Sequence, residues 1–182
     1  MKKYAIILLF FSIFTFVLAG YKTFLSLTHP IKYQDIIIEN AEKFQIPAST
    51  IASIINVESS YRPNVKSNKN AIGLMQIKLS TANYLNDIND FDNISEEKLF
   101  EVKTNIDYGC TYLNYLIKKF QNFDLAIIAY NAGETRVRTW LNDDILSPDG
   151  KKLIYIPYKE TREYLEKVKK NIDFYSKVYK DL

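Results

Sequence analysis

Residues 49–77 of the chain read STIASIINVESSYRPNVKSNKNAIGLMQI. The first part of this stretch is predicted to form a helix, with Ser49 placed to cap its first turn. Apolar side chains recur there at helical spacing, at Ile51, Ile54 and Ile55. Glu58 occupies the next position on that apolar face. Since burial disfavours the charged form of a carboxyl group, the pKa of Glu58 should rise, and a carboxyl group protonated near neutral pH can act as a general acid.

A glutamate at the end of an apolar face can equally lie at its rim, with the carboxylate in water. The residues after Glu58 favour a cleft. Pro63 disfavours helical angles in the residue before it, so the helix should end there. Residues 67–73 are a turn-rich polar loop, and LMQI follows as residues 74–77. A polar loop that folds back beside a half-buried acid would form one wall of a cleft.

These residues carry a resemblance to a known family. Glu58-Ser59 followed by Gly73-Leu74-Met75-Gln76 resembles the catalytic domain of family 1 (Slt-type) lytic transglycosylases, which is goose-lysozyme-like. The resemblance runs over residues 33–175 in the family's order and continues at Ala129-Tyr130-Asn131-Ala132-Gly133, Pro157, Glu160-Thr161 and Tyr164. It implies an all-α fold: a single lysozyme-like helical domain with a substrate cleft.

One departure from the family's pattern falls in the loop. The family usually has a Gly-Ala pair before Gly-Leu-Met-Gln, and this chain has Asn70-Ala71. Asparagine tolerates left-handed backbone angles better than other non-glycine residues, so the turn is expected to survive.

The resemblance also implies a reaction. Glu58 would act first as acid and then as base, cleaving peptidoglycan between N-acetylmuramic acid and N-acetylglucosamine without water and leaving a 1,6-anhydromuramic end. The substrate's own C6 hydroxyl would be the nucleophile, which agrees with the lack of a good second carboxylate: Asp87, Asp90 and Asp92 lie in a loop and Glu160 on a remote helix.

Six further residues are expected at the substrate on the strength of the resemblance: Ser67, Met75, Gln76, Tyr130, Asn131 and Tyr164. Gln76 can donate and accept hydrogen bonds, and Met75 can pack on the apolar face of a sugar. Tyr130 should line the pocket of the acid. Tyr164 should bring a second hydroxyl near it, and its alternative is a core tyrosine with a satisfied hydroxyl. Glu160-Thr161 is expected to cap the final helix.

Two other functions stay open. One is a goose-type muramidase, a true hydrolase in which an aspartate of the acidic loop positions water. The other is a non-catalytic wall-binding or assembly domain, against which the presence of Glu58 argues.

Composition excludes several classes of function. The net charge is +3, with 24 basic and 21 acidic residues, which is too balanced to indicate nucleic-acid binding. Cys110 is the only cysteine and His29 the only histidine. These counts exclude an intrachain disulfide and a Ser-His-Asp triad and leave too few ligands for structural zinc. Residues 86–93 space acids regularly but lack the glycine of a calcium loop. No cofactor or metal is expected, and Cys110 is read as packing.

The N-terminus reads as a targeting segment. Lys2 and Lys3 precede an almost unbroken apolar run at residues 4–18, so residues 1–20 are predicted to be a signal peptide or membrane anchor. Residues 21–30 would be a tether and 31–182 the catalytic domain. Tyr21 stands where a lipidated cysteine would have to be, which excludes lipidation there. Either reading places the domain outside the cytoplasm, in the periplasm, free or attached to the inner membrane. Peptidoglycan glycan strands are the expected partner, and the short build resembles members that serve secretion or conjugation machinery.

Helices are expected over residues 33–44, 49–59, 79–85, from 95, 106–120, 124–130, 134–141 and from 158 to the end. Gly133 is expected to end one of them, and residues 142–156 to form a loop.

Overall fold

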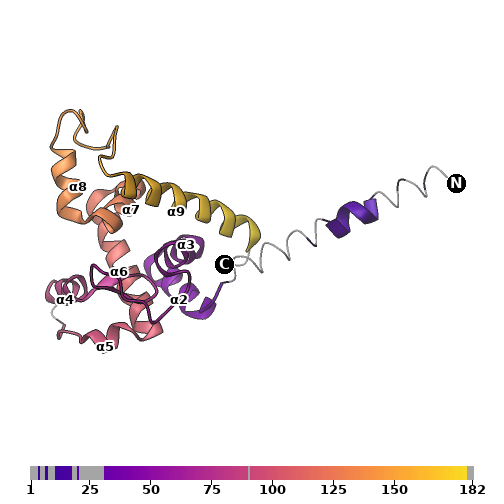
Figure 1. Cartoon of the computed structure of the whole chain (residues 1–182), viewed down its shortest axis with the longest axis horizontal. Helices are drawn as coiled ribbons and strands as arrows, with labels where there is room; N and C mark the ends of the chain where they lie inside the picture. Colours follow the sequence, from indigo (N-terminus) through magenta and orange to yellow (C-terminus); the bar gives the residue numbers. More distant parts are fainter. Residues whose placement is uncertain are drawn as a thin grey trace.

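The computed structural model describes residues 4, 7, 11–17, 20, 31–89 and 91–179. The all-α prediction is confirmed (Figure 1). The helices are α2 (Gln34–Phe44), α3 (Ala48–Ser59), α4 (Leu79–Asp87), α5 (Glu96–Leu99), α6 (Val102–Phe120), α7 (Phe123–Ala132), α8 (Glu134–Leu141) and α9 (Lys159–Val178). Two short strands, β1 (Ala71–Ile72) and β2 (Ile77–Lys78), pair antiparallel. The predicted leader is only partly described, and the tether lies outside the described residues.

Two helices hold the core together. α3 packs between α2 and α9, and every residue from Ala48 to Ile55 is buried, including the polar residues Ser49, Thr50 and Ser53. α6 packs against α2, α4, α5 and α7. Its buried stripe includes Cys110, which confirms that this cysteine packs in the core. Glu58 therefore sits on the last turn of the most enclosed helix.

The predicted cap of α3 is wrong, whereas two other predicted helix ends are confirmed. Pro47 is the N-cap, and its carbonyl accepts a hydrogen bond from the Thr50 N–H at 2.8 Å, so Ser49 lies inside the first turn and is buried. Ser95 caps α5 by accepting from the Lys98 N–H at 3.4 Å. Gly133 ends α7 with a φ of 91°, a conformation that suits glycine.

The prediction that Glu160-Thr161 caps α9 is also wrong. Tyr158 is the N-cap of α9 and makes no side-chain capping bond. The Thr161 hydroxyl instead donates to the Asn131 side-chain oxygen at 2.9 Å. Because Asn131 lies near the end of α7, this bond joins the start of α9 to the start of the α7–α8 corner.

The β1–β2 hairpin contains the turn at residues 73–76, and hydrogen bonds of the Asn105 side chain hold this turn in place. The Asn105 amide donates to the carbonyls of Ile72 and Leu99 at 2.9 and 2.8 Å, and its oxygen accepts from the Met75 N–H at 2.7 Å. Asn70, Gly73 and Gln76 have left-handed φ angles of 57°, 74° and 51°. The expectation that Asn70 tolerates such an angle is thus confirmed.

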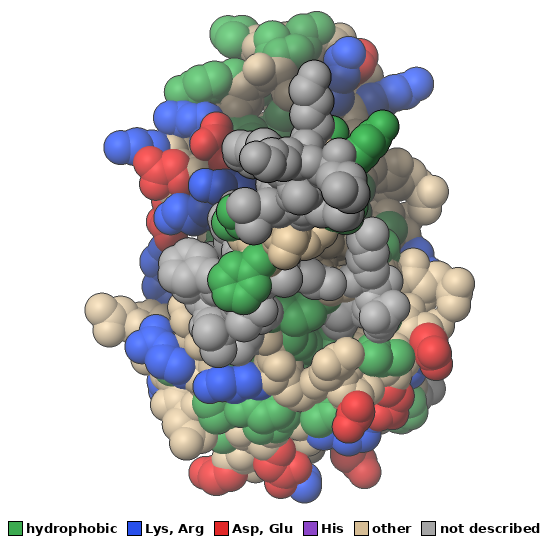
Figure 2. Space-filling view, turned by 90° about the vertical axis from the view of Figure 1, so that its right-hand side faces the viewer, with side chains coloured by type: hydrophobic (Ala, Val, Ile, Leu, Met, Phe, Trp, Pro, Cys, Tyr) green, Lys and Arg blue, Asp and Glu red, His purple; other side chains and the backbone are tan. Residues whose placement is uncertain are grey.

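The surface mixes both signs of charge. On the face in Figure 2, lysine, arginine and acidic side chains lie side by side around the rim. Hydrophobic side chains gather at the top of that view, where Figure 1 places the loop between α8 and α9. Ile145 and Ile154 of this loop are 82% and 63% exposed. Within the described part of the chain, no helix combines the length with the hydropathy that a membrane span requires.

Candidate active site

Glu58 lies at the C-terminal end of α3, and its side chain is half-buried. The next residue fixes this end of the helix, because the Ser59 hydroxyl donates to the Leu74 carbonyl at 2.8 Å. Burial raises the pKa of the Glu58 carboxyl to about 7. The Tyr164 hydroxyl lowers this pKa, and the negative charge of Glu160 raises it further. The predicted rise in the pKa of Glu58 is confirmed, and the alternative of a fully solvated rim carboxylate is wrong.

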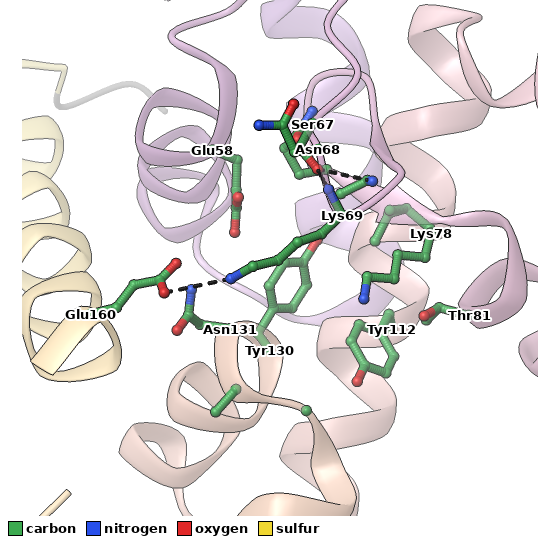
Figure 3. Close-up of a pocket in the computed structure, with 15 residues that line it drawn as sticks. Glu58, Ser67, Asn68, Lys69, Lys78, Thr81, Tyr112, Tyr130, Asn131 and Glu160 are labelled. Carbon is green, nitrogen blue, oxygen red and sulfur yellow. Dashed lines mark hydrogen bonds and ion pairs between the residues drawn. The ribbon is translucent and has the colours of Figure 1, made fainter. Parts of the chain in front are cut away.

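Glu58 opens into a cavity of about 450 Å³. Its walls come from α3, the loop before β1, the hairpin, the start of α4, the middle of α6, the α7–α8 corner and the start of α9 (Figure 3). The lining residues are Glu58, Ser67, Asn68, Lys69, Ala71, Gln76, Ile77, Lys78, Thr81, Tyr112, Tyr130, Asn131, Ala132, Gly133 and Glu160. The expected cleft is therefore present, with the acid on one wall.

Four of the predicted substrate residues line this cavity, and each is held by the fold. The Ser67 hydroxyl accepts from the Ala71 N–H at 3.0 Å. The Gln76 amide donates to the Gly73 carbonyl at 2.9 Å, and the Tyr130 hydroxyl donates to the Met75 carbonyl at 2.9 Å. Asn131 accepts from Thr161. These contacts fix the side chains before any ligand binds, which reduces the entropy lost on binding.

Met75 and Tyr164 do not line the cavity. Contrary to expectation, the Met75 side chain is fully buried and lies against Gly109 of α6, where it cannot reach a sugar. Tyr164 is buried behind Glu58. Its hydroxyl interacts with the Glu58 carboxyl but makes no hydrogen bond of ordinary geometry within the described residues. The prediction of a second hydroxyl near the acid is confirmed, and the alternative of a satisfied core hydroxyl is not.

Glu160 corrects the prediction of a remote carboxylate. The start of α9 brings it to the cavity, where Lys69 of the loop reaches across and forms an ion pair at 3.5 Å (Figure 3). Both side chains are 73% exposed, so this pair contributes little to stability. Glu160 was part of the motif that carried the resemblance, and its position in that motif was the available signal.

Other lining residues gave no signal in the sequence. The loop, the hairpin, the start of α4 and α6 meet at the cavity, and only this brings the following residues to it: Lys69, Lys78, Thr81 and Tyr112. Asp87 and Asp92 of the acidic loop do not line it, and Asp90 lies outside the described residues.

Comparisons with known proteins agree with this geometry. The family model described as "Transglycosylase SLT domain" matches residues 35–152. The soluble lytic murein transglycosylase of Escherichia coli K12 is 36% identical over 142 residues, covering 76% of this chain and 22% of that protein. The membrane-bound lytic murein transglycosylase E of Buchnera aphidicola is 37% identical over 138 residues, covering 65% of this chain and 62% of that protein.

Solved structures show the same likeness. An inactive mutant of lytic transglycosylase Slt from Pseudomonas aeruginosa superposes with a TM-score of 0.74 and 29% identity, over 84% of this chain and 25% of that one. The 70-kDa soluble lytic transglycosylase of Escherichia coli superposes with a TM-score of 0.71 and 32% identity, over 84% of this chain and 25% of that one. The chain spans about a quarter of those structures and less than a quarter of the Escherichia coli relative. The family match covers more than half of this sequence, and the chain belongs to the transglycosylase SLT domain family.

Proposed function

We propose that this protein cleaves the bond between N-acetylmuramic acid and N-acetylglucosamine in peptidoglycan without consuming water. Protonated Glu58 gives its proton to the glycosidic oxygen as the bond from that oxygen to the anomeric carbon breaks. The Glu58 carboxylate then takes the proton of the muramic C6 hydroxyl while that oxygen bonds to the anomeric carbon. A 1,6-anhydromuramic end forms, and Glu58 returns to its starting state.

The observation that carries the proposal is the pKa of Glu58, about 7, at the wall of the cavity. Near neutral pH the two forms of this carboxyl group are similarly populated, so one side chain can serve as acid and then as base. Proton transfer of this kind accelerates reactions by about 10²–10⁴-fold. Tyr164 would gain a full hydrogen bond to the carboxylate as the proton leaves, which supports the first step.

A hydrolase would need a second carboxylate or a positioned water. Asp87 and Asp92, which the muramidase alternative would draw on, do not line the cavity. Glu160 does, but it is already paired with Lys69. These facts support the non-hydrolytic reaction.

The decisive experiment digests purified peptidoglycan in H₂¹⁸O and analyses the released muropeptides by mass spectrometry. The proposal expects anhydro ends without ¹⁸O, and a hydrolase would give reducing ends that carry the label. Glu58→Gln should lose activity by about 10²–10⁴-fold, since the amide cannot exchange the proton. Unchanged turnover by Glu58→Gln would instead favour the non-catalytic wall-binding domain.

The proposed place of action is outside the cytoplasm. The positive start and the apolar run at residues 4–18 support export, with the segment either cleaved or kept as an anchor in the inner membrane. N-terminal sequencing of the protein recovered from the soluble periplasmic fraction and from the membrane fraction separates the two. A role beside secretion or wall-spanning machinery rests on the resemblance alone, and cross-linking in intact cells tests it.

A further inference from the structure

Not every charged residue of the cavity forms an ion pair with an oppositely charged side chain. Four of its lining residues carry charge: Glu58, Glu160, Lys69 and Lys78. Lys69 is paired with Glu160 at 3.5 Å. Among the described residues, Lys78 forms no ion pair. Lys78 therefore brings an uncompensated positive charge into a site that binds a largely uncharged polymer.

The position of Lys78 is fixed by the backbone around it. It is the last residue of β2 and the residue before α4, so its main chain is held by the pairing of Lys78 with Ala71 and by the start of the helix. Its side chain is exposed and lies across the pocket from Glu58, on the side of Thr81 and Tyr112 (Figure 3). The amine is thus held in the cavity on the side away from Glu58.

The chemistry of the polymer limits what the amine can meet. The sugar rings and acetamides of a glycan strand carry no charge. Negative charge enters only through the lactyl branch of muramic acid, which ends in a free carboxylate or carries a peptide with carboxylates of its own. An ammonium group beside hydroxyl and aromatic side chains is suited to bind such a group.

We propose that Lys78 binds a carboxylate borne by the lactyl branch of a muramic acid residue next to the cleavage site, and so selects strands that carry this charge. The inference rests on the proposed function, because it assumes a glycan strand in the cavity. It assigns Lys78 a part in binding and specificity, with no part in proton transfer.

The test measures binding to Glu58→Gln, which keeps the strand intact during the measurement. Three soluble strands of equal length are compared by calorimetry: one bearing peptides, one stripped of peptides with free lactyl carboxylates, and one stripped with those carboxylates converted to methyl amides. Adding Lys78→Met should weaken binding of carboxylate-bearing strands about three- to tenfold, the range of a partly solvated ion pair. Binding of the amide strand should stay within about twofold.

The pattern identifies the source of the charge. If Lys78→Met weakens binding only of peptide-bearing strands, the carboxylate belongs to the peptide. If it weakens binding only of stripped strands, the carboxylate belongs to the lactyl group. Weaker binding of both kinds of strand shows that Lys78 accepts either carboxylate. Lys78→Arg should restore binding, and the effect should shrink as salt rises. Lys170→Met, at an exposed lysine of α9 outside the cavity, is the matched control and should change nothing.

Equal weakening on all three strands, or none on any, overturns the proposal. Its failure is separable from failure of the proposed function. The reaction is judged by the ends that the wild type produces, whereas the carboxylate preference is judged by binding alone. A wild type that produced no anhydro ends but showed the Lys78 preference would refute the reaction and keep the site.

Discussion

Glu58 is held in surroundings that disfavour its charged form. Its pKa is about 7 in the folded protein against 4.5 for an unperturbed glutamate side chain. Below pH 4.5 both the folded and unfolded states carry the proton, so the ionisation of Glu58 does not lower the free energy of unfolding. Between pH 4.5 and 7 the unfolded state loses its proton first, and the free energy of unfolding falls as pH rises. Above pH 7 the loss is complete, on the order of 3 kcal/mol.

We therefore predict that Glu58→Gln is more stable than the wild type at pH 8, by about 2–3 kcal/mol, and equal to it at pH 4. The amide resembles the protonated acid in size and polarity but cannot ionise. Urea unfolding at several pH values measures the difference. Glu163→Gln, an exposed position on α9, is the control and should show no such trend. A difference that is constant across pH would contradict the raised pKa.

Two neighbours of Glu58 should move the pH profile of activity in opposite directions. Glu160 raises the pKa of Glu58 by its charge, so Glu160→Gln should shift the alkaline limb of kcat/KM to lower pH. Tyr164 lowers that pKa through its hydroxyl, so Tyr164→Phe should shift the limb to higher pH. The rate of anhydromuropeptide release, measured from pH 5 to 9 for each variant, gives the acidic and alkaline limbs of the profile.

A merely structural role would lower activity at every pH and leave the limb in place. Shifts of the same sign in both variants would contradict the assignment. Thermal unfolding of each variant verifies that the fold is retained. Because Lys69 pairs with Glu160, Glu160→Gln should also free this lysine, and Lys69→Met serves to separate the two effects.

Prediction from the sequence worked best for Glu58, because helical periodicity places it at the end of an apolar face and the turn-rich loop that follows favours a cleft there. It worked less well for side chains whose surroundings come from distant segments. Met75 was expected at the sugar, but Gly109 of α6 leaves a space that its side chain fills. Lys69 and Lys78 carry no local signal, since a lysine in a loop is the same in sequence whether it faces a cleft or water.

At the scale of elements, the turn at residues 73–76 joins the acid-bearing helix to α6. A Cβ atom at Gly73 would lie 2.7 Å from the Asn105 side-chain carbon, and φ there is +74°. At Gly133 φ is also positive, +91°, but a Cβ would meet nothing within 4 Å. The two glycines thus share the backbone strain that alanine would suffer, and only Gly73 adds a clash with a buried amide that holds three hydrogen bonds.

Gly73→Ala should accordingly destabilise the protein by about 3 kcal/mol or more, and Gly133→Ala by about 1–2 kcal/mol. Denaturant unfolding measures both. In an Asn105→Ala background the cost of Gly73→Ala should fall, because the clash is gone while the strain remains. Equal costs for the two glycines in the wild-type background would show that Asn105 does not constrain the turn.

The helices themselves were largely predictable, because periodicity and turn residues are local. The predicted helices all exist, but α6 begins four residues before residue 106, the expected start, and α4 ends two residues after residue 85. The cap of α3 was misassigned, because the carbonyl of Pro47 opens the helix before Ser49 can. Local sequence patterns do not give the position of Glu160, because it depends on how α9 packs against α3 and α7.

For the molecule as a whole, α9 is the element that completes the site. The family match ends at residue 152, before α9 begins at Lys159. Nevertheless α9 packs against α3 and α7, and it brings Glu160 and Tyr164 to Glu58. Its buried apolar side chains are Tyr164, Val168, Tyr175 and Val178. Each contributes about 1.5–3 kcal/mol, so together they rival the 5–15 kcal/mol that stabilises an ordinary domain.

A chain that ends at Pro157 should therefore lose its cooperative unfolding transition, and a peptide of residues 158–179 added in trans should restore both the transition and activity. The peptide's sequence offers a matched pair of tests. Val168 is fully buried and Lys167 is exposed. Val168→Asp in the peptide should abolish restoration, because a buried unpaired charge costs several kcal/mol, whereas Lys167→Asp should restore normally. Calorimetry and muropeptide release measure the two readouts. A truncated chain that unfolds cooperatively and releases anhydromuropeptides by itself would show that α3 and α7 form the site without α9.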